Sequence, residues 1–124
     1  MRVVIQRSNE ASVVVDGKTV GKIDQGLVVL VGFTLGDSFE TIDYMAKKIV
    51  NLRIFPDDNG IMNKSILDYG GDILSVSQFT LYASCKKGNR PSYVSAMSGN
   101  EAVSLYNHFN QELYKYVHVE TGIF

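Results

Sequence analysis

Three residues whose side chains could do chemistry stand close together in the segment SVSQFTLYASCKKGNRPSY, residues 75–93: Ser77, Gln78 and Thr80. They lie among apolar residues, in a stretch that otherwise has the composition of a buried strand. A buried hydroxyl or amide without a hydrogen-bond partner costs roughly 1–3 kcal/mol. The segment therefore predicts either side chains that pair across strands and with the backbone, or a site that binds a ligand.

The order of these residues predicts an irregularity in the strand. In a regular strand, alternate side chains share a face. On that pattern one face carries Ser75, Ser77, Phe79 and Leu81, and the other carries Val76, Gln78, Thr80 and Tyr82. Ser77 and Thr80 can serve one site only if the strand bulges or ends between them. We expect this break where Val-Ser changes to Gln-Phe-Thr.

A basic loop follows the polar strand. Lys86, Lys87 and Arg90 stand close together, and Pro91 and Tyr93 come next. Cations beside an aromatic ring suit phosphate binding combined with base stacking, and a solvated basic loop is the alternative. Taken with the polar strand, the loop predicts a pocket for the end of an RNA, in which the loop holds the backbone and the strand acts on the terminus.

Other kinds of site find less support. His108, His118 and Cys85 have no metal-ligand spacing, so we expect no metal site and histidines that are exposed or hydrogen-bonded. A hydrolase with Ser77 or Thr80 as nucleophile and a histidine as base is a further alternative. The chain has no G-x-S-x-G motif to support it. Cys85 lies beside two lysines but has no partner thiol, so we interpret it as a bystander.

The elements that must position these residues follow from hydrophobic periodicity. Strands are predicted at 2–6, 12–16, 19–23, 26–33 and 72–83, a loop at 84–99, and a last strand at 117–124. Asp16-Gly17 predicts a hairpin turn. Helices are predicted at 38–52, behind an Asp-Ser N-cap, and after Gly99-Asn100. This order predicts a single α+β domain: a curved, mainly antiparallel, barrel-like sheet with two helices packed on one side.

Composition narrows the class of protein. A chain of 124 residues with net charge −1 lacks the overall positive field of many duplex-DNA binders, so we expect no DNA partner. No apolar run approaches the ~20 residues of a membrane span, and the charged N-terminal segment does not resemble a signal peptide. With a single cysteine as well, we expect a cytoplasmic protein.

The run SVSQFTLYA followed by KKGNRPSY closely resembles the D-aminoacyl-tRNA deacylase family. The segments VVIQRSNEASVVVDG, GLVVLVG, KKIVNLRIF and VHVETGIF do so too, and the resemblance covers Met1 to Phe124. It implies a homodimer with a β-barrel-like fold and an active site at the subunit interface. It also implies hydrolysis of the ester that joins a D-amino acid, or glycine mischarged on tRNA for alanine, to the terminal adenosine. No cofactor is implied.

The resemblance also implies roles for single residues. Ser77, Gln78 and Thr80 belong to the first signature of the family and are the catalytic candidates. Phe79 and Leu81 in the same signature, together with Arg7 and Phe124, are the substrate-binding candidates. Thr80 matches a threonine proposed as nucleophile, whereas a later view gives the assisting role to the 2′-hydroxyl of the tRNA itself. Lys86, Lys87 and Arg90 are the candidates for the tRNA backbone.

One family feature is missing from this sequence. The second signature, a Gly–cis-Pro segment that excludes L-amino acids, is expected shortly after the closing TGIF. The prolines here are Pro56 and Pro91, and neither follows a glycine. We therefore expect residues 1–124 to form one deacylase domain truncated at the C-terminus. The alternative function is a non-catalytic module that binds the end of tRNA.

Overall fold

The computed structural model describes residues 1–124. Its strands are β1 (Arg2–Ser8), β2 (Ala11–Val15), β3 (Lys18–Ile23), β4 (Gly26–Gly32), β5 (Phe55–Pro56), β6 (Met62–Lys64), β7 (Asp72–Ser77) and β8 (Val119–Thr121). Its helices are α1 (Phe39–Asn51), α2 (Ile66–Tyr69) and α3 (Gly99–Tyr114), with one 3-10 turn at Phe79–Leu81. The α+β class is confirmed.

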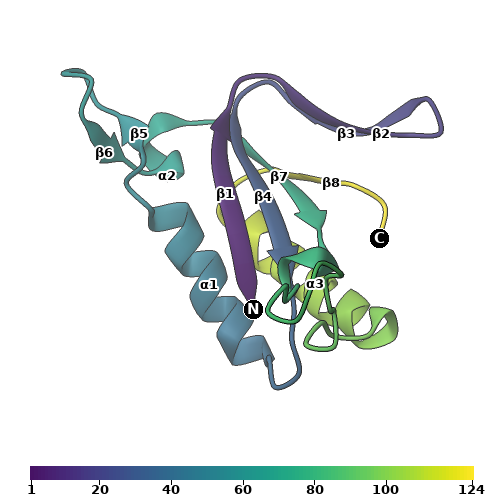
Figure 1. The fold of residues 1–124 in the computed structure, drawn as a ribbon. Helices are drawn as coiled ribbons and strands as arrows, with labels where there is room; N and C mark the ends of the chain where they lie inside the picture. Colours follow the sequence, from purple (N-terminus) through teal and green to yellow (C-terminus); the bar gives the residue numbers. More distant parts are fainter.

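The main sheet is mixed and open, which corrects the prediction of a mainly antiparallel, barrel-like sheet. Its strand order is β1-β4-β7-β8, and only the β1–β4 pair is antiparallel, whereas β4–β7 and β7–β8 are parallel. Parallel neighbours need a crossover connection. Here α1 lies in the connection from β4 to β7, and α3 lies in the connection from β7 to β8 (Figure 1). The closing segment therefore docks on an edge of the sheet.

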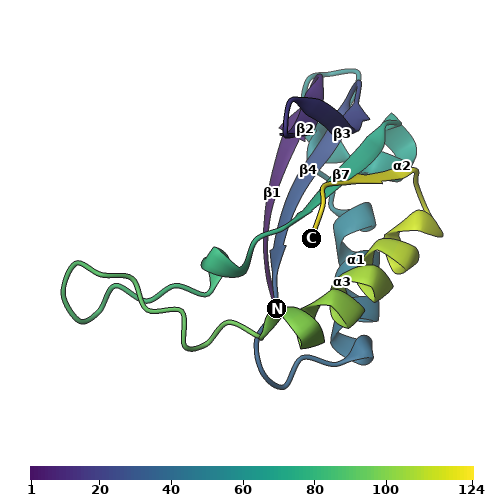
Figure 2. The ribbon, with the colours of Figure 1, turned by 90° about the vertical axis from the view of Figure 1, so that its right-hand side faces the viewer.

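Helices α1 and α3 cover one face of the sheet (Figure 2), as the sequence predicted. Ser38 caps α1 by accepting a hydrogen bond from the backbone N–H of Thr41. The shared core contains Leu27, Val29 and Val31 of β4, Ile73 of β7, Ile42, Ala46, Ile49 and Val50 of α1, and Leu105, Phe109 and Leu113 of α3. The short helix α2 was not predicted. No helix has the length and apolar character that crossing a membrane requires.

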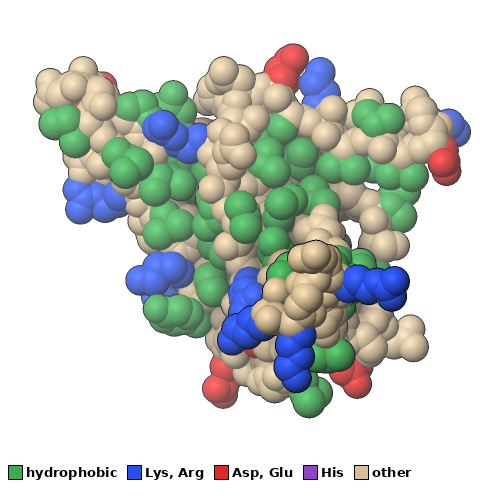
Figure 3. Space-filling model, viewed as in Figure 1, with side chains coloured by type: hydrophobic (Ala, Val, Ile, Leu, Met, Phe, Trp, Pro, Cys, Tyr) green, Lys and Arg blue, Asp and Glu red, His purple; other side chains and the backbone are tan.

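The opposite face of the main sheet has no helix on it. Val4 on β1 is half exposed there. Hydrophobic side chains gather over β1 and β4 on this face, and lysine and arginine side chains surround the loop below them (Figure 3). The β2–β3 hairpin extends to one side, and positive φ angles at Asp16 and Gly17 confirm its predicted turn.

Candidate active site

Strand β7 ends where the sequence predicted a break. The backbone N–H of Gln78 donates to Val31 O at 2.7 Å, as the last hydrogen bond to β4. The chain then turns through one 3-10 turn at Phe79–Leu81. The prediction that one strand runs from 72 to 83 is wrong beyond Ser77. Because the strand stops here, Ser77 and the residues of the turn can face a common space.

Gly32 lets the turn lie close against β4. A Cβ at position 32 would lie 2.8 Å from Gln78 O and 3.3 Å from the Cβ of Leu81, so a larger residue would push the turn away. The turn is closed by hydrogen bonds from Leu81 N to Gln78 O (3.3 Å) and from Tyr82 N to Phe79 O (3.0 Å). The N–H groups of Phe79 and Thr80 donate to no acceptor in the chain. Two adjacent backbone donors are therefore free at this turn.

A cleft of about 440 Å³ opens beside the turn, within the range of small-ligand sites. Its lining includes Ser77, Phe79, Met97, Ile123 and Phe124. Phe79 and Phe124 are 57% and 51% exposed, so both offer apolar surface to a ligand. The cleft thus joins the end of β7, the start of α3 and the C-terminal residues, which are far apart in the sequence.

Of the three predicted catalytic residues, Ser77 lines the cleft, whereas the side chains of Gln78 and Thr80 are outside its lining. Gln78 Nε2 donates a hydrogen bond to Thr80 Oγ1, while Ser77 lines the cleft. The alternative of polar side chains that pair with each other therefore holds for Gln78 and Thr80, while ligand binding stays a prediction. Ser75 has a structural position instead: its carbonyl accepts from the Tyr106 hydroxyl at 2.7 Å, and its Oγ is buried without a hydrogen-bond partner.

Arg2 was not predicted as a site residue, yet it braces the turn. Its Nη1 donates to Leu81 O at 2.9 Å, and its guanidinium lies 4.4 Å from the centre of the Tyr82 ring. Burial raises the pKa of the Tyr82 phenol, and the nearby Asp37 carboxylate adds to this effect, while Arg2 opposes it. Tyr82 therefore stays uncharged at neutral pH and acts as a packing surface for Arg2. Leu81 contributes through its carbonyl.

The predicted tRNA-backbone residues Lys86, Lys87 and Arg90 are exposed on a loop of residues 83–98. Figure 2 shows this 83–98 loop projecting from the body on the side away from α1 and α3. None of the three side chains forms a hydrogen bond or an ion pair with the chain. At the near end of the loop, the rings of Tyr93 and Phe79 form a T-shaped pair, with ring centres 5.4 Å apart.

Arg7 does not join this cleft. Arg2 pairs with Gly32 in the β1–β4 register, whereas Arg7 pairs with Leu27 near the other end of the strands. At ~3.4 Å per residue the two arginines are separated by roughly 17 Å along β1. Arg7 lines a second, more polar cleft of about 290 Å³, together with Asn9, Gln25 and Tyr69. Within a single chain, the structure therefore separates Arg7 from the other predicted site residues.

The cleft contains no group of metal-ligating side chains. Three such residues lie together only between α1 and α3, where Asp43 and Glu112 join His108. The expectation of no metal site rested on the spacing of His108, His118 and Cys85 and left the carboxylates out. The spacing of His108 and Glu112 on one helix was the available signal, and the approach of Asp43 depends on helix packing.

The sequence model of a family described as "D-Tyr-tRNA(Tyr) deacylase" matches residues 4–124. The chain belongs to this family. Curated relatives of this chain include two D-aminoacyl-tRNA deacylases. The one from Bacillus cytotoxicus is 56% identical, and the one from Bacillus thuringiensis (strain Al Hakam) is 54% identical. Each match covers 100% of this chain and 86% of the relative.

Two solved structures share the deacylase family fold described above. The protein named c-Myc DNA Unwinding Element Binding Protein is 39% identical, with a TM-score of 0.94 over 100% of this chain and 85% of that one. A probable eukaryotic D-amino acid tRNA deacylase is 19% identical, with a TM-score of 0.78 over 92% of this chain and 67% of that one. At this low identity, the similarity to the second structure supports the fold alone.

Proposed function

We propose that this chain hydrolyses the ester bond between a D-amino acid and the terminal adenosine of tRNA, and that it also accepts glycine mischarged on tRNA for alanine. The activity releases free tRNA and serves quality control in translation. In this proposal the protein acts in the cytoplasm. Membership of the family and the names of its relatives support this function. The observation that carries it is the ligand-sized cleft at the end of β7, with two free backbone donors beside it.

The geometry suits ester hydrolysis by water. A water oxygen bonds to the carbonyl carbon and loses a proton, and the carbonyl oxygen gains negative charge. The N–H groups of Phe79 and Thr80 donate hydrogen bonds to that oxygen, which lowers the barrier because the charge develops only in the transition state. The bond from the carbonyl carbon to the ribose oxygen then breaks, and the ribose oxygen takes up a proton.

The polar side chains orient this reaction. Thr80 Oγ1 already accepts from Gln78 Nε2, so its own proton is available to the substrate or to the attacking water. Ser77 supplies a second hydroxyl to the cleft. The neighbouring 2′-hydroxyl of the ribose positions the water by proximity. Under this scheme Thr80 assists hydrolysis and does not form a covalent intermediate.

Five of the other predicted residues bind the substrate in this proposal. Phe79 and Phe124 provide exposed rings on which the terminal adenine can stack, at about 1–3 kcal/mol for one base. Lys86, Lys87 and Arg90 bind phosphates of the acceptor end, and they are free to do so because no acidic side chain pairs with them.

A homodimer is part of this proposal. Hydrophobic side chains gather on the helix-free face of β1 and β4 (Figure 3), and Val4 of β1 is half exposed. A second copy of the chain would remove this apolar surface from water, which is the main favourable term in association. Sedimentation velocity on the purified chain tests this part of the proposal, and a monomer at all concentrations would refute it.

The activity is tested by a deacylation time course on D-tyrosyl-tRNA with the wild type, Thr80→Ala and Ser84→Ala. Ser84 is a matched control, because it is exposed on the nearby loop and pairs with Ser92 only through the backbone. We expect Thr80→Ala to lose about tenfold in rate at most, in line with one lost hydrogen bond. Ser84→Ala should keep the full rate. Complete loss in Thr80→Ala with tRNA binding intact would favour a nucleophilic threonine.

The second candidate function is binding of a tRNA end without hydrolysis. The projecting basic loop favours it, because phosphate contacts alone give affinity for nucleic acid. A filter-binding assay run beside the time course separates the two functions, since binding without turnover supports the second. Duplex DNA as a competitor tests the preference for RNA, and we expect it to displace tRNA poorly.

A further inference from the structure

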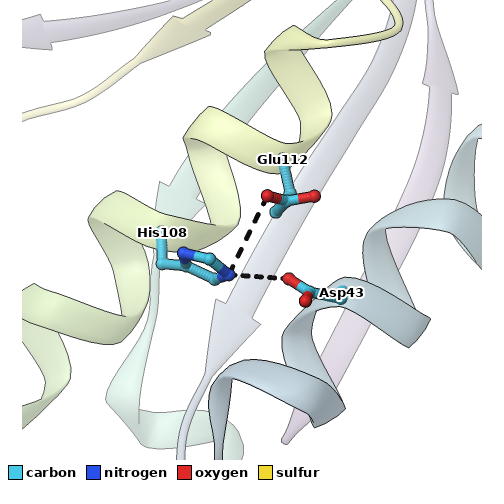
Figure 4. A group of neighbouring side chains, drawn as sticks. All are labelled: Asp43, His108 and Glu112. Carbon is cyan, nitrogen blue, oxygen red and sulfur yellow. Dashed lines mark hydrogen bonds and ion pairs between the residues drawn. The ribbon is translucent and has the colours of Figure 1, made fainter.

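A second group of reactive side chains lies outside the cleft, between helices α1 and α3. The α1–α3 cluster consists of Asp43 on α1 and His108 and Glu112 on α3 (Figure 4). His108 Nε2 lies 2.6 Å from Asp43 Oδ1 and 4.0 Å from Glu112 Oε1. The three ligand atoms all lie within 4.8 Å of one another. One ring nitrogen therefore faces two carboxylates from two different elements.

The packing of the two helices holds these side chains in place. His108 and Glu112 are four residues apart and share one face of α3. The imidazole ring stacks on Phe39 with centres 4.1 Å apart and planes 11° apart, which fixes the ring with Nε2 toward the carboxylates. The side chains of His108 and Glu112 are only 21% and 15% exposed, while that of Asp43 is 53% exposed. The cluster is thus preformed and reachable from solvent.

We propose that the α1–α3 cluster binds one divalent transition-metal ion, with Zn²⁺ as the representative, through His108 Nε2 and one oxygen each of Asp43 and Glu112. Imidazole and carboxylate are established ligands of such ions, and water can fill the remaining positions. Ligand atoms bound tetrahedrally to the same Zn²⁺ are roughly 3.3–3.6 Å apart when each lies at about 2.0–2.2 Å from the metal. The present separations of 2.6 and 4.0 Å need only small side-chain movements to reach that arrangement.

An ordinary ion pair is the competing interpretation of the cluster, and the chain offers a matched example of one. His118 Nε2 lies 2.6 Å from Glu120 Oε2, the same distance as in the His108–Asp43 pair, but no third ligand stands beside it. Zn²⁺ sites built by proteins use three or four protein ligands. The difference between the two histidines therefore isolates the contribution of the third side chain.

Lys115 limits the affinity of the proposed site. Its Nζ lies 2.7 Å from Glu112 Oε1, the same oxygen that approaches His108. A metal ion must displace this ammonium group or share the carboxylate with it. Removing the charge of Lys115 should therefore tighten metal binding, which a purely structural ion pair would not show.

The effect of the metal is to link α1 to α3. The cluster lies about 14 Å along α3 from Gly99 at the cleft, at 1.5 Å per residue. We therefore assign the ion no part in ester hydrolysis. An ion that binds only the folded chain raises its stability as the concentration of the ion exceeds its dissociation constant.

The test is calorimetric titration of Zn²⁺ into untagged Cys85→Ser protein, in which the exposed thiol cannot compete, with thermal melting in parallel. We expect one saturable site that raises the melting temperature, and no comparable response to Mg²⁺, which prefers all-oxygen sites. His108→Ala should abolish binding. Asp43→Asn and Glu112→Gln, which preserve shape, should each weaken it by at least about tenfold.

Two further variants complete the test. His118→Ala should bind Zn²⁺ as the parent does, and Lys115→Met should bind it more tightly. Absence of saturable binding, or binding that survives in Asp43→Asn, Glu112→Gln and His108→Ala alike, would overturn the proposal. Circular dichroism of each variant separates loss of the site from loss of the fold.

Discussion

Two polar connections in this chain differ in what holds them. The β5–β6 turn, residues 57–61, is organised by one of its own side chains. Asp57 Oδ1 accepts hydrogen bonds from Asn59 N (2.9 Å) and Ile61 N (3.0 Å), and Oδ2 accepts one from Asn63 Nδ2 (3.2 Å). Every partner lies within six residues of Asp57, so the turn is specified by its local sequence.

The 83–98 loop, in contrast, is also held by residues that are distant in the sequence. Thr34 Oγ1 donates to Ser95 O at 2.6 Å, and Met97 N donates to Phe33 O at 2.9 Å. Within the loop, two backbone hydrogen bonds join Ser84 and Ser92. The 3-10 turn that precedes the loop likewise depends on Arg2 and Gly32.

This difference has a consequence for function. A turn held by its own side chain keeps its shape when the rest of the fold relaxes, whereas the candidate active site depends on the N-terminus and on β4. Substitutions far from the cleft in sequence should therefore impair activity, while a substitution in the β5–β6 turn should affect stability alone.

The largest effect is expected for Gly32→Ala. The added Cβ would meet Gln78 O at 2.8 Å, so the 3-10 turn and its free N–H groups must shift. A misplacement of about 1 Å in a catalytic site can reduce the rate on the order of 100-fold. Single-turnover deacylation of D-tyrosyl-tRNA measures this effect. An unchanged rate would show that the turn is not the catalytic element.

Asp37→Ala should have the next largest effect. The Met1 ammonium group lies 2.8 Å from Asp37 Oδ1, and Thr34 N donates to Oδ2 at 2.8 Å. The side chains of Met1 and Asp37 are 0% and 9% exposed. Losing these charge-assisted hydrogen bonds should lower the free energy of unfolding by about 2 kcal/mol. Urea denaturation measures it.

Asp58→Ala is the control for this substitution. Asp58 is fully exposed and lies 3.9 Å from Lys64 Nζ, and such surface pairs contribute ~0–1 kcal/mol. Equal losses of stability in Asp37→Ala and Asp58→Ala would contradict the special role of the N-terminal pair.

Arg2→Met should have a smaller effect, mainly on activity. Methionine keeps an apolar stem over Tyr82 but cannot donate to Leu81 O. The lost hydrogen bond and cation–π contact amount to about 1 kcal/mol, or roughly a fivefold lower rate of deacylation. Arg7→Met on the same strand serves as the comparison, since in a single chain Arg7 lies at the other cleft. In monomeric protein, a larger loss from Arg7→Met than from Arg2→Met would reverse this assignment.

Asp57→Asn should have the smallest effect. The pKa of Asp57 lies below its ordinary value of 3.8, chiefly because the Ile61 backbone N–H donates to it, with further donors from Asn59 and Asn63. A carboxyl group whose pKa is lowered in the folded state stabilises the fold at pH values above its ordinary pKa. This contribution is lost as the pH falls through the lowered pKa. The wild type should therefore exceed Asp57→Asn slightly in melting temperature at pH 7.

The pH dependence of that small difference is the sharper observation. It should shrink below pH 3.8, where protonation removes the advantage of the carboxylate. Deacylation at pH 7 should be the same for both proteins. A loss of activity in Asp57→Asn would mean that the two connections are coupled.

The features that sequence analysis predicted correctly are those with local causes. The N-cap at Ser38, the turn at Asp16-Gly17 and the break after Ser77 each follow from a few adjacent residues. The apolar faces of α1 and α3 follow from periodicity. These signals require no knowledge of which element lies beside which.

The features that were missed depend on pairing between distant segments. Strand order could not be read from the apolar run of β4, because a buried strand has the same composition with parallel or antiparallel neighbours. Arg2 and Asp43 carry no local signal, and their partners Leu81 and His108 are 79 and 65 residues away. The separation of Arg7 from the cleft likewise appears only once the register of β1 is known.

The most direct test of the central claim is an NMR titration of ¹⁵N-labelled chain with D-tyrosyl-adenosine in which an amide replaces the ester. If the cleft at the end of β7 binds the aminoacyl end, the backbone N–H signals of Phe79 and Thr80 should shift downfield in a saturable manner, together with that of Phe124. Shifts confined to Ser8, Asn9 and Gln25 at the second cleft, with Phe79 and Thr80 unmoved, would contradict the account.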